Sequence, residues 1–139
     1  MAALFVGALL TTTTALADWG IYQSYIIVDA GSGNAYYAGG INSENALVFG
    51  GSHLGAVAQG ASLTLNGGEL KTWKNGNNGN SNVCGGTLFY QVYASGSALG
   101  DYTGVALSYA GDLGSGNQRW DATSAGIDLA SGLSAGEYV

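Results

Sequence analysis

The sequence predicts an all-β fold, an antiparallel β-sandwich of about seven to nine short strands, and three observations carry this prediction. The 139 residues contain 25 glycines and no proline. The glycines separate short runs of β-branched and aromatic residues, a pattern typical of strands joined by tight turns. After residue 17, no segment keeps the helical spacing of apolar residues for more than about two turns. The strand order, immunoglobulin-like or jelly-roll, stays open.

The first 17 residues differ from the rest and resemble a cleaved secretory signal peptide. Ala3–Leu10 is apolar, and small residues at Ala15 and Ala17 fit the specificity of signal peptidase. This apolar run is too short to span a bilayer of about 30 Å, which takes ~20 helical residues. We therefore expect a mature chain over residues 18–139, forming one domain that is secreted or at the cell surface and not inserted in a membrane.

The start of the signal peptide is unusual, because no Lys or Arg precedes the apolar run. We expect the translation start to lie upstream of Met1. An N-terminal core strand or a hydrophobic helix is the alternative interpretation of this segment.

The first three strand candidates are runs of apolar and aromatic residues that end at glycine-containing turns. They are Ile21–Asp29, Ala35–Ala38 and Ala46–Phe49.

A β-hairpin is predicted within Ser62–Trp73. Leu63 and Leu65 alternate with polar residues before Asn66-Gly67-Gly68, and a second alternating run follows. Asn-Gly between two such runs favours a type I′ turn, because both residues tolerate a positive φ. Glu69, Lys71 and Trp73 then share one strand face, which we expect to be the solvated one.

The second half of the chain supplies the remaining strand candidates. Val83–Tyr93 has apolar residues on both faces, which predicts a central strand. Tyr102–Tyr109 alternates, Asp112–Asp121 is predicted to be a polar loop, and Ile127 and Leu129 flank a further short strand.

The last residues, Gly132–Val139, have the pattern of a turn followed by the opening of another strand. Because strands average about five or six residues, we expect the domain to be truncated before its last strand and to be followed by further domains of a longer protein. If the chain stops at this point, the sheet has an unpaired position to which another strand can add.

Composition excludes several classes of function. Nine acidic and three basic residues give a net charge of −6, which argues against binding nucleic acid or anionic membranes. Cys84 is the single cysteine, so no intrachain disulfide forms, and we expect a small buried thiol at a strand start. His53 is the single histidine, so a zinc site lacks ligands. No nucleophile motif is present, and we expect no enzymatic activity.

Aromatic residues are the candidate ligand-binding groups. Trp73 and Trp120, with Tyr36 and Tyr37, could stack on sugar rings, and Arg119 could contact the same ligand. The alternative interpretation is that these rings pack in the core and on strand faces, as aromatic residues do in β-proteins.

A calcium site is the one cofactor hypothesis. Asp112, Ser115, Asn117 and Asp121 offer oxygen ligands within ten residues, although their spacing is not that of an EF-hand. The alternative is that these side chains cap the backbone of their own loop.

Four stretches resemble a β-sandwich module found near the start of large extracellular proteins of Bacteroidetes-type bacteria, many of them exported by type IX secretion. They are Leu63–Glu69, Leu88–Tyr93, Asp112–Trp120 and Gly132–Val139. The resemblance implies surface or secreted placement and assigns no catalytic residue.

These observations favour a non-catalytic module of a secreted or cell-surface bacterial protein with an adhesive, spacing or accessory role. The expected partners are polysaccharide, other surface proteins or further domains of the same chain. Two alternatives are a carbohydrate-binding module that uses surface Trp and Tyr, and a surface fibre subunit that assembles by strand addition.

Overall fold

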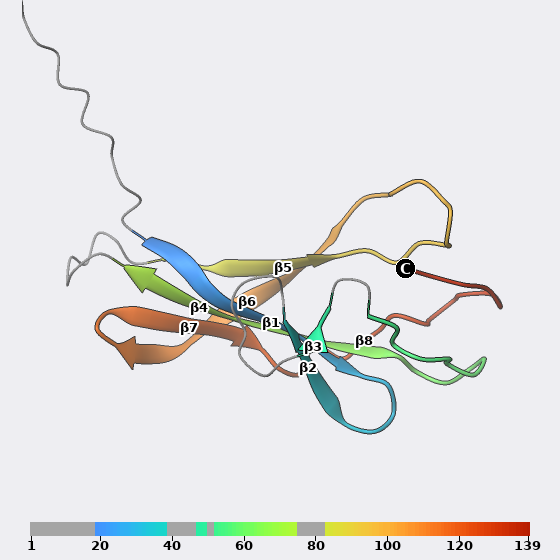
Figure 1. Ribbon diagram of the computed structural model, residues 1–139, viewed down its shortest axis with the longest axis horizontal. Coiled ribbons are helices and arrows are strands. Elements are labelled where there is room, and N and C mark those ends of the chain that lie inside the picture. The colour runs from blue at the N-terminus through green and yellow to red at the C-terminus, as the bar shows by residue number, and fades with distance from the viewer. Residues whose placement is uncertain (1–18, 39–46, 50–51, 75–82) are drawn as a thin grey trace, which may run out of the picture.

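The computed structural model describes residues 19–38, 47–49, 52–74 and 83–139 (Figure 1). The predicted signal peptide over residues 1–17 lies outside the described residues. The elements of the described part are all strands, which confirms the all-β prediction: β1 Trp19–Asp29, β2 Asn34–Ala38, β3 Leu47–Val48, β4 Thr64–Lys74, β5 Gly86–Tyr90, β6 Thr103–Gly114, β7 Asn117–Ala122 and β8 Ile127–Asp128. This part contains no helix long and apolar enough to span a membrane.

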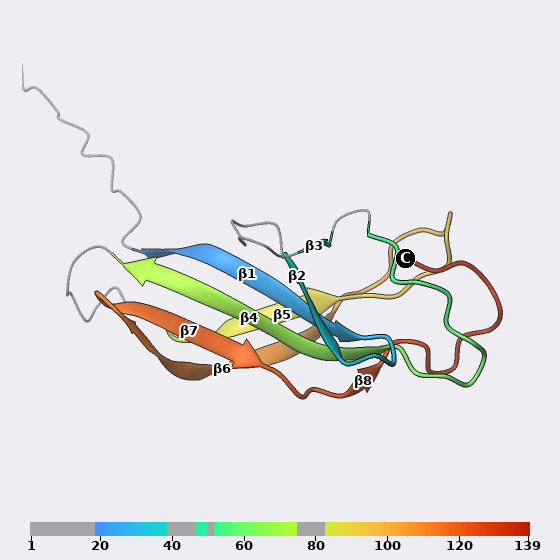
Figure 2. The same ribbon diagram turned by 60° about the horizontal axis from the view of Figure 1, so that its bottom comes forward.

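The strands form one hydrogen-bonded sheet in the order β3-β2-β1-β4-β7-β6-β5, with β8 paired to one end of β4. All pairs are antiparallel except β2 with β3. The sheet is strongly curved, like half of a barrel (Figure 2). A second sheet packed face to face on the first, as a sandwich requires, is not among the described residues.

The curvature brings β5 back over β4, although the two strands are far apart in the sheet order. A Cβ built on Gly86 of β5 would lie 2.9 Å from Cδ2 of Leu70, and one built on Gly68 would lie 3.5 Å from Cδ2 of Leu88. Leu70 therefore points toward β5. We call this concave side of the sheet the inner face, and the side turned away from β5 the outer face.

Strand β4 corrects the predicted hairpin. The chain does not turn at Asn66-Gly67-Gly68 but continues as one strand from Thr64 to Lys74. Ile27 of β1 pairs with Gly67 and Val28 pairs with Leu65, so Asn66 is the extra residue of a β-bulge. Gly67 has a φ of 121°, a conformation open to glycine but strained for other residues.

The predicted loop over Asp112–Asp121 is also wrong, because these residues form the ends of β6 and β7. The two strands are joined by a two-residue turn at Ser115 and Gly116. Both turn residues have positive φ, 50° and 80°, as a type I′ hairpin requires. The hairpin between β6 and β7 thus has Ser-Gly at its turn, and the predicted Asn-Gly turn is not formed.

The segment Val83–Tyr93 contains an edge strand rather than the predicted central one. β5 covers Gly86–Tyr90 and pairs only with β6 among the described strands. Apolar residues occur on both of its faces because Phe89 is left 63% exposed. Cys84, just before this strand, is exposed, so the expectation of a buried thiol is wrong.

The core is small and lies along β1, β4, β6 and β7. Its buried apolar residues are Ile27, Val28, Leu65, Leu107 and Trp120. Two buried polar residues of the inner face are hydrogen bonded: Thr72 Oγ1 lies 3.4 Å from the Gln118 carbonyl oxygen, and Gln118 Oε1 accepts from the Val83 amide at 3.0 Å. The second bond ties the segment leading into β5 to β7.

Candidate functional site

Polar side chains form two rows across β1, β4 and β7 on the outer face. Residues directly opposite each other on antiparallel strands point to the same face. The register therefore aligns Gln23, Lys71 and Arg119 in one row and Tyr25, Glu69 and Asp121 in the next. We call these six residues the polar array.

Lys71 is the centre of the array. Its Nζ donates a hydrogen bond to Gln23 Oε1 at 2.8 Å and lies 3.5 Å from Glu69 Oε1. The same nitrogen lies 5.6 Å from the centre of the Tyr25 ring, within cation–π range. These contacts hold one cation among two oxygen acceptors and one aromatic face.

Arg119 and Asp121 form the β7 side of the array. Arg119 Nε lies 3.3 Å from Asp121 Oδ2, and both side chains are partly exposed. Such a surface pair stabilises a fold by about 0–1 kcal/mol, so its main effect is to orient the two groups. Two cations and two carboxylates leave the array without net charge, whereas the whole chain carries −6.

Aromatic residues lie on the same face at both ends of the array. Trp73 follows Lys71 by two residues and therefore lies on the same face. A Cβ built on Gly20 would lie 2.7 Å from Nε1 of Trp73, so the indole lies against the backbone of this glycine. At the other end the exposed Tyr36 ring lies 6.4 Å from the Tyr25 ring, edge to face. The prediction that Glu69, Lys71 and Trp73 share one face is confirmed.

The five predicted ligand-binding residues are divided between two faces. Trp73, Arg119 and Tyr36 are on the outer face. Trp120 is on the inner face and only 7% exposed, with its ring 5.4 Å from that of Tyr109. Tyr37 faces the opposite way from Tyr36 and packs edge to face on Phe49, at 5.7 Å. A single platform that includes both Trp73 and Trp120 is therefore not formed.

The four predicted calcium ligands are not brought together either. Asn117 and Asp121 lie four residues apart on one strand, which is about 13 Å, whereas calcium ligands must all lie about 2.3–2.6 Å from the ion. Asp112 is opposite Gln118 and thus on the inner face, whereas Asn117 and Asp121 are on the outer face. Ser115 is in the turn. No group of three or more potential metal-ligating His, Cys, Asp or Glu side chains occurs within residues 19–38, 47–49, 52–74 and 83–139.

Asp112 instead interacts with Tyr109. A hydrogen bond from the Tyr109 hydroxyl to this carboxylate raises the pKa of Tyr109, and partial desolvation and the negative charge of Asp112 raise it further. The bond favours the neutral phenol of the folded state. Its stabilising effect is therefore complete below the pKa of an unfolded tyrosine and is lost as the pH rises through the folded pKa.

Replacing Asp112 by alanine should accordingly lower the pKa of Tyr109 toward its ordinary value. The measurement is a tyrosinate absorbance titration in which the curve of Tyr109→Phe, subtracted from that of each protein, isolates this residue. An unchanged Tyr109 titration in Asp112→Ala would show that the hydrogen bond does not form in solution.

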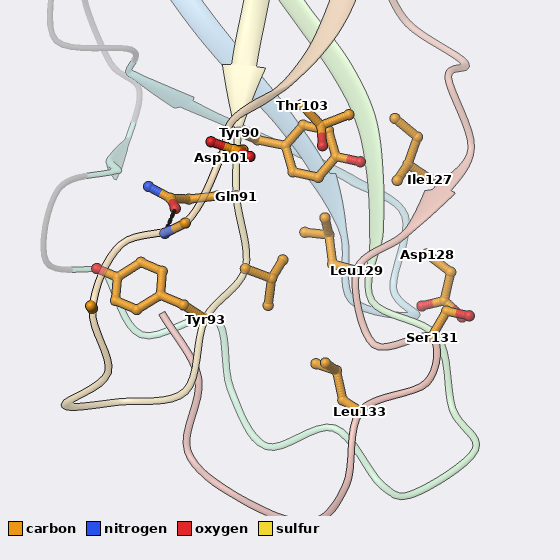
Figure 3. A pocket seen from close by; sticks show the side chains of 13 residues that line it. Tyr90, Gln91, Tyr93, Asp101, Thr103, Ile127, Asp128, Leu129, Ser131 and Leu133 are labelled. Atoms are coloured by element: carbon orange, nitrogen blue, oxygen red, sulfur yellow. Dashed lines mark hydrogen bonds between the residues drawn. The ribbon is translucent and has the colours of Figure 1, made fainter.

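A cleft of about 410 Å³ lies at the end of the sheet near the C-terminus (Figure 3). Its walls are the chain around Tyr90–Tyr93, the segment before β6 and residues 127–133. Two of its polar groups bind the backbone nearby: Gln91 Oε1 accepts from the Gly100 amide at 3.0 Å, and Asp128 Oδ1 accepts from the Ala130 amide at 3.0 Å. These two groups order the local loops, whereas the polar array gathers six side chains from three strands on one face, so we regard the array as the stronger candidate site.

Sequence reasoning found part of this array and missed the rest. The alternation around Lys71 placed Glu69 and Trp73 beside it, but Gln23 and Tyr25 come from a strand almost fifty positions earlier in the chain. Only the strand order brings them together. His53, the single histidine, is exposed, and its Nδ1 accepts from the Gly55 amide at 3.1 Å, a local contact away from the array.

No protein family, curated protein or solved structure matches the chain.

Proposed function

We propose that this protein is a non-catalytic module of a secreted or cell-surface bacterial protein, and that its outer face binds polysaccharide. The observation that carries the proposal is the polar array, in which a row with two cationic donors lies beside a row with two carboxylate acceptors on one sheet face. Ligand binding at such a surface supports an adhesive role, which needs no catalytic group.

The chemistry of the array suits an uncharged, hydroxyl-rich ligand. Lys71 and Arg119 donate hydrogen bonds, while Glu69 and Asp121 accept them, so both lone pairs and protons of sugar hydroxyls can be satisfied. The array has no net charge, which disfavours strongly charged ligands. Trp73 and Tyr36 at its two ends offer apolar ring surface to the apolar faces of pyranose rings.

The proposed location rests on the sequence. The small residues at Ala15 and Ala17 support export, and the resemblance to the N-terminal module of large Bacteroidetes-type extracellular proteins supports a surface role. The same resemblance supports the finer proposal that the curved sheet is part of a sandwich with immunoglobulin-like or jelly-roll order.

Native affinity electrophoresis through gels that contain soluble polysaccharides tests the binding. We expect the protein to be retarded by at least one member of a panel of β-glucan, xylan, mannan and α-glucan. The double variant Lys71→Gln/Arg119→Gln should bind about tenfold more weakly, because each substitution replaces a charge-assisted hydrogen bond by a neutral one.

The matched control is Lys74→Gln, which changes a cation of β4 on the inner face. It should leave the retardation unchanged, and circular dichroism should show that all variants are folded. Binding at the outer face would be contradicted if no polysaccharide of the panel retarded the protein, or if the Lys74 variant lost as much retardation as the double variant.

A further inference from the structure

The indole of Trp73 lies in a place that glycine on the neighbouring strand leaves open. Trp73 of β4 is paired with Gly20 of β1. A Cβ built on Gly20 would lie 2.7, 2.9 and 3.0 Å from Nε1, Cε2 and Cζ2 of the indole, and the first two distances are shorter than real Cβ contacts. The ring therefore fills the space that a side chain at position 20 would occupy.

The same three distances show how the ring is turned. Cε2 lies between Nε1 and Cζ2, so an approach to this edge within the ring plane would bring a Cβ closer to both flanking atoms than to Cε2. Cζ2 is instead the farthest of the three atoms. The Cβ position thus lies out of the ring plane, and the indole turns a face toward the backbone of β1.

The backbone of Gly20 does not itself require glycine. Gly20 lies within β1 and is not among the residues with a positive φ. A glycine inside a strand weakens it, and often marks a place where another group approaches the backbone closely. At Gly20 that group is the indole of Trp73.

The other face of the indole is the one that can meet a ligand. Trp73 is partly exposed, and the face toward Gly20 is covered. Lys71 lies two residues away on the same strand, about 7 Å along it, and its Nζ lies 3.5 Å from Glu69 Oε1. An aromatic face thus lies next to a hydrogen-bond donor and an acceptor, the combination that suits a sugar with C–H groups on its ring face and hydroxyls around its rim.

The stereochemistry of a sugar chain decides how well it stacks on such a face. In β-1,4-linked glucose or xylose, all hydroxyls and both linkage oxygens are equatorial, so only C–H groups cover the two ring faces and the chain is a flat ribbon. In α-1,4-linked glucose, one linkage oxygen of each sugar is axial and the chain coils. An indole lying against the sheet therefore favours the flat, all-equatorial chain.

We propose that Trp73, held against the sheet by Gly20, is the stacking platform of the outer face, and that its ligand is a chain of β-1,4-linked glucose or xylose. Gly20 is a positioning residue, because it acts through the place that it leaves for the indole. This inference rests on the proposed function, since it names the class of polysaccharide that the outer face binds.

Isothermal titration calorimetry with cellohexaose and maltohexaose tests the ligand class. Both are chains of glucose, and they differ only in the configuration of the linkage. We expect cellohexaose to bind at least about tenfold more tightly than maltohexaose, and xylohexaose also to bind more tightly than maltohexaose. Equal or tighter binding of maltohexaose, or retardation by mannan or α-glucan alone, would overturn this inference and leave polysaccharide binding in place. If no glycan binds, the proposed function fails as well.

A double-mutant cycle tests the role of Gly20. Gly20→Ala and Trp73→Ala should each weaken cellohexaose binding about tenfold, and the double variant should bind no more weakly than Trp73→Ala alone. Gly85→Ala is the control, because a Cβ there would meet nothing within 4 Å, and it should bind as the unchanged protein does.

Additive losses in the double variant would show that Gly20 does not act through the indole and would overturn its positioning role. Circular dichroism identifies any variant that does not fold. The comparison of cellohexaose with maltohexaose uses the unchanged protein, so a misfolded variant leaves that test intact.

Discussion

Replacing Gly67 by alanine should lower the free energy of unfolding by about 3 kcal/mol or more, because strain at a special φ and a backbone clash add together. The φ of 121° is strained for any residue with a side chain. A Cβ at this position would also collide with the carbonyl oxygen of Ala122 on β7 and lie 2.9 Å from its carbonyl carbon. Relief requires β4 and β7 to separate where they pair.

The control for this prediction is Gly33→Ala in the turn between β1 and β2. Gly33 also has a positive φ, 99°, but a Cβ there would meet nothing within 4 Å. Its substitution isolates the cost of φ alone, about 1 kcal/mol or slightly more. Urea unfolding of both variants gives the comparison, and equal losses would argue against the close approach of β4 and β7.

Trp120→Ala should destabilise the protein by about 3–5 kcal/mol, the usual cost of deleting a buried Trp side chain. Trp120 is 7% exposed on the inner face and packs edge to face with Tyr109. The substitution therefore leaves a cavity beneath β6 and β7. Substitution of Trp120 should thus lower stability without removing a ligand contact, whereas substitutions in the polar array of the outer face should remove ligand contacts.

Trp19→Ala is the matched control, because Trp19 is 50% exposed at the start of β1. Its loss should change stability by roughly 0.5 kcal/mol or less, as for most surface substitutions. Thermal or urea unfolding followed by circular dichroism measures both. If Trp120→Ala proved as mild as Trp19→Ala, the ring would not be buried in solution.

The sequence predicted the strands better than their connections. Alternating and β-rich runs located β1, β2 and the beginning of β6, because these runs report directly on a half-buried pleated surface. Asn66-Gly67 was misassigned because a type I′ turn and a glycine bulge need the same positive φ. The pairing of Gly67 with Ile27, a partner forty residues earlier, decides between them, and no local pattern contains it.

The local sequence also does not predict which strand lies at the edge of the sheet, or which residues of different strands share a face. An apolar run such as the one around Phe89 is typical of a central strand, yet here it forms the last strand in the described sheet order. For the polar array, alternation placed Glu69 and Lys71 together. The contribution of Gln23 and Asp121 follows from the order β1-β4-β7, which depends on non-local pairing.

The property of this protein that we propose is polysaccharide binding by the outer face of the sheet. Its most direct test is a titration of ¹⁵N-labelled protein with an oligosaccharide of the glycan that retards it most, followed by backbone amide chemical shifts. We predict that the largest changes occur at Gln23, Lys71 and Arg119, on three different strands. Changes confined to the inner face, or to the cleft around Tyr90, would show that the outer face is not the binding site.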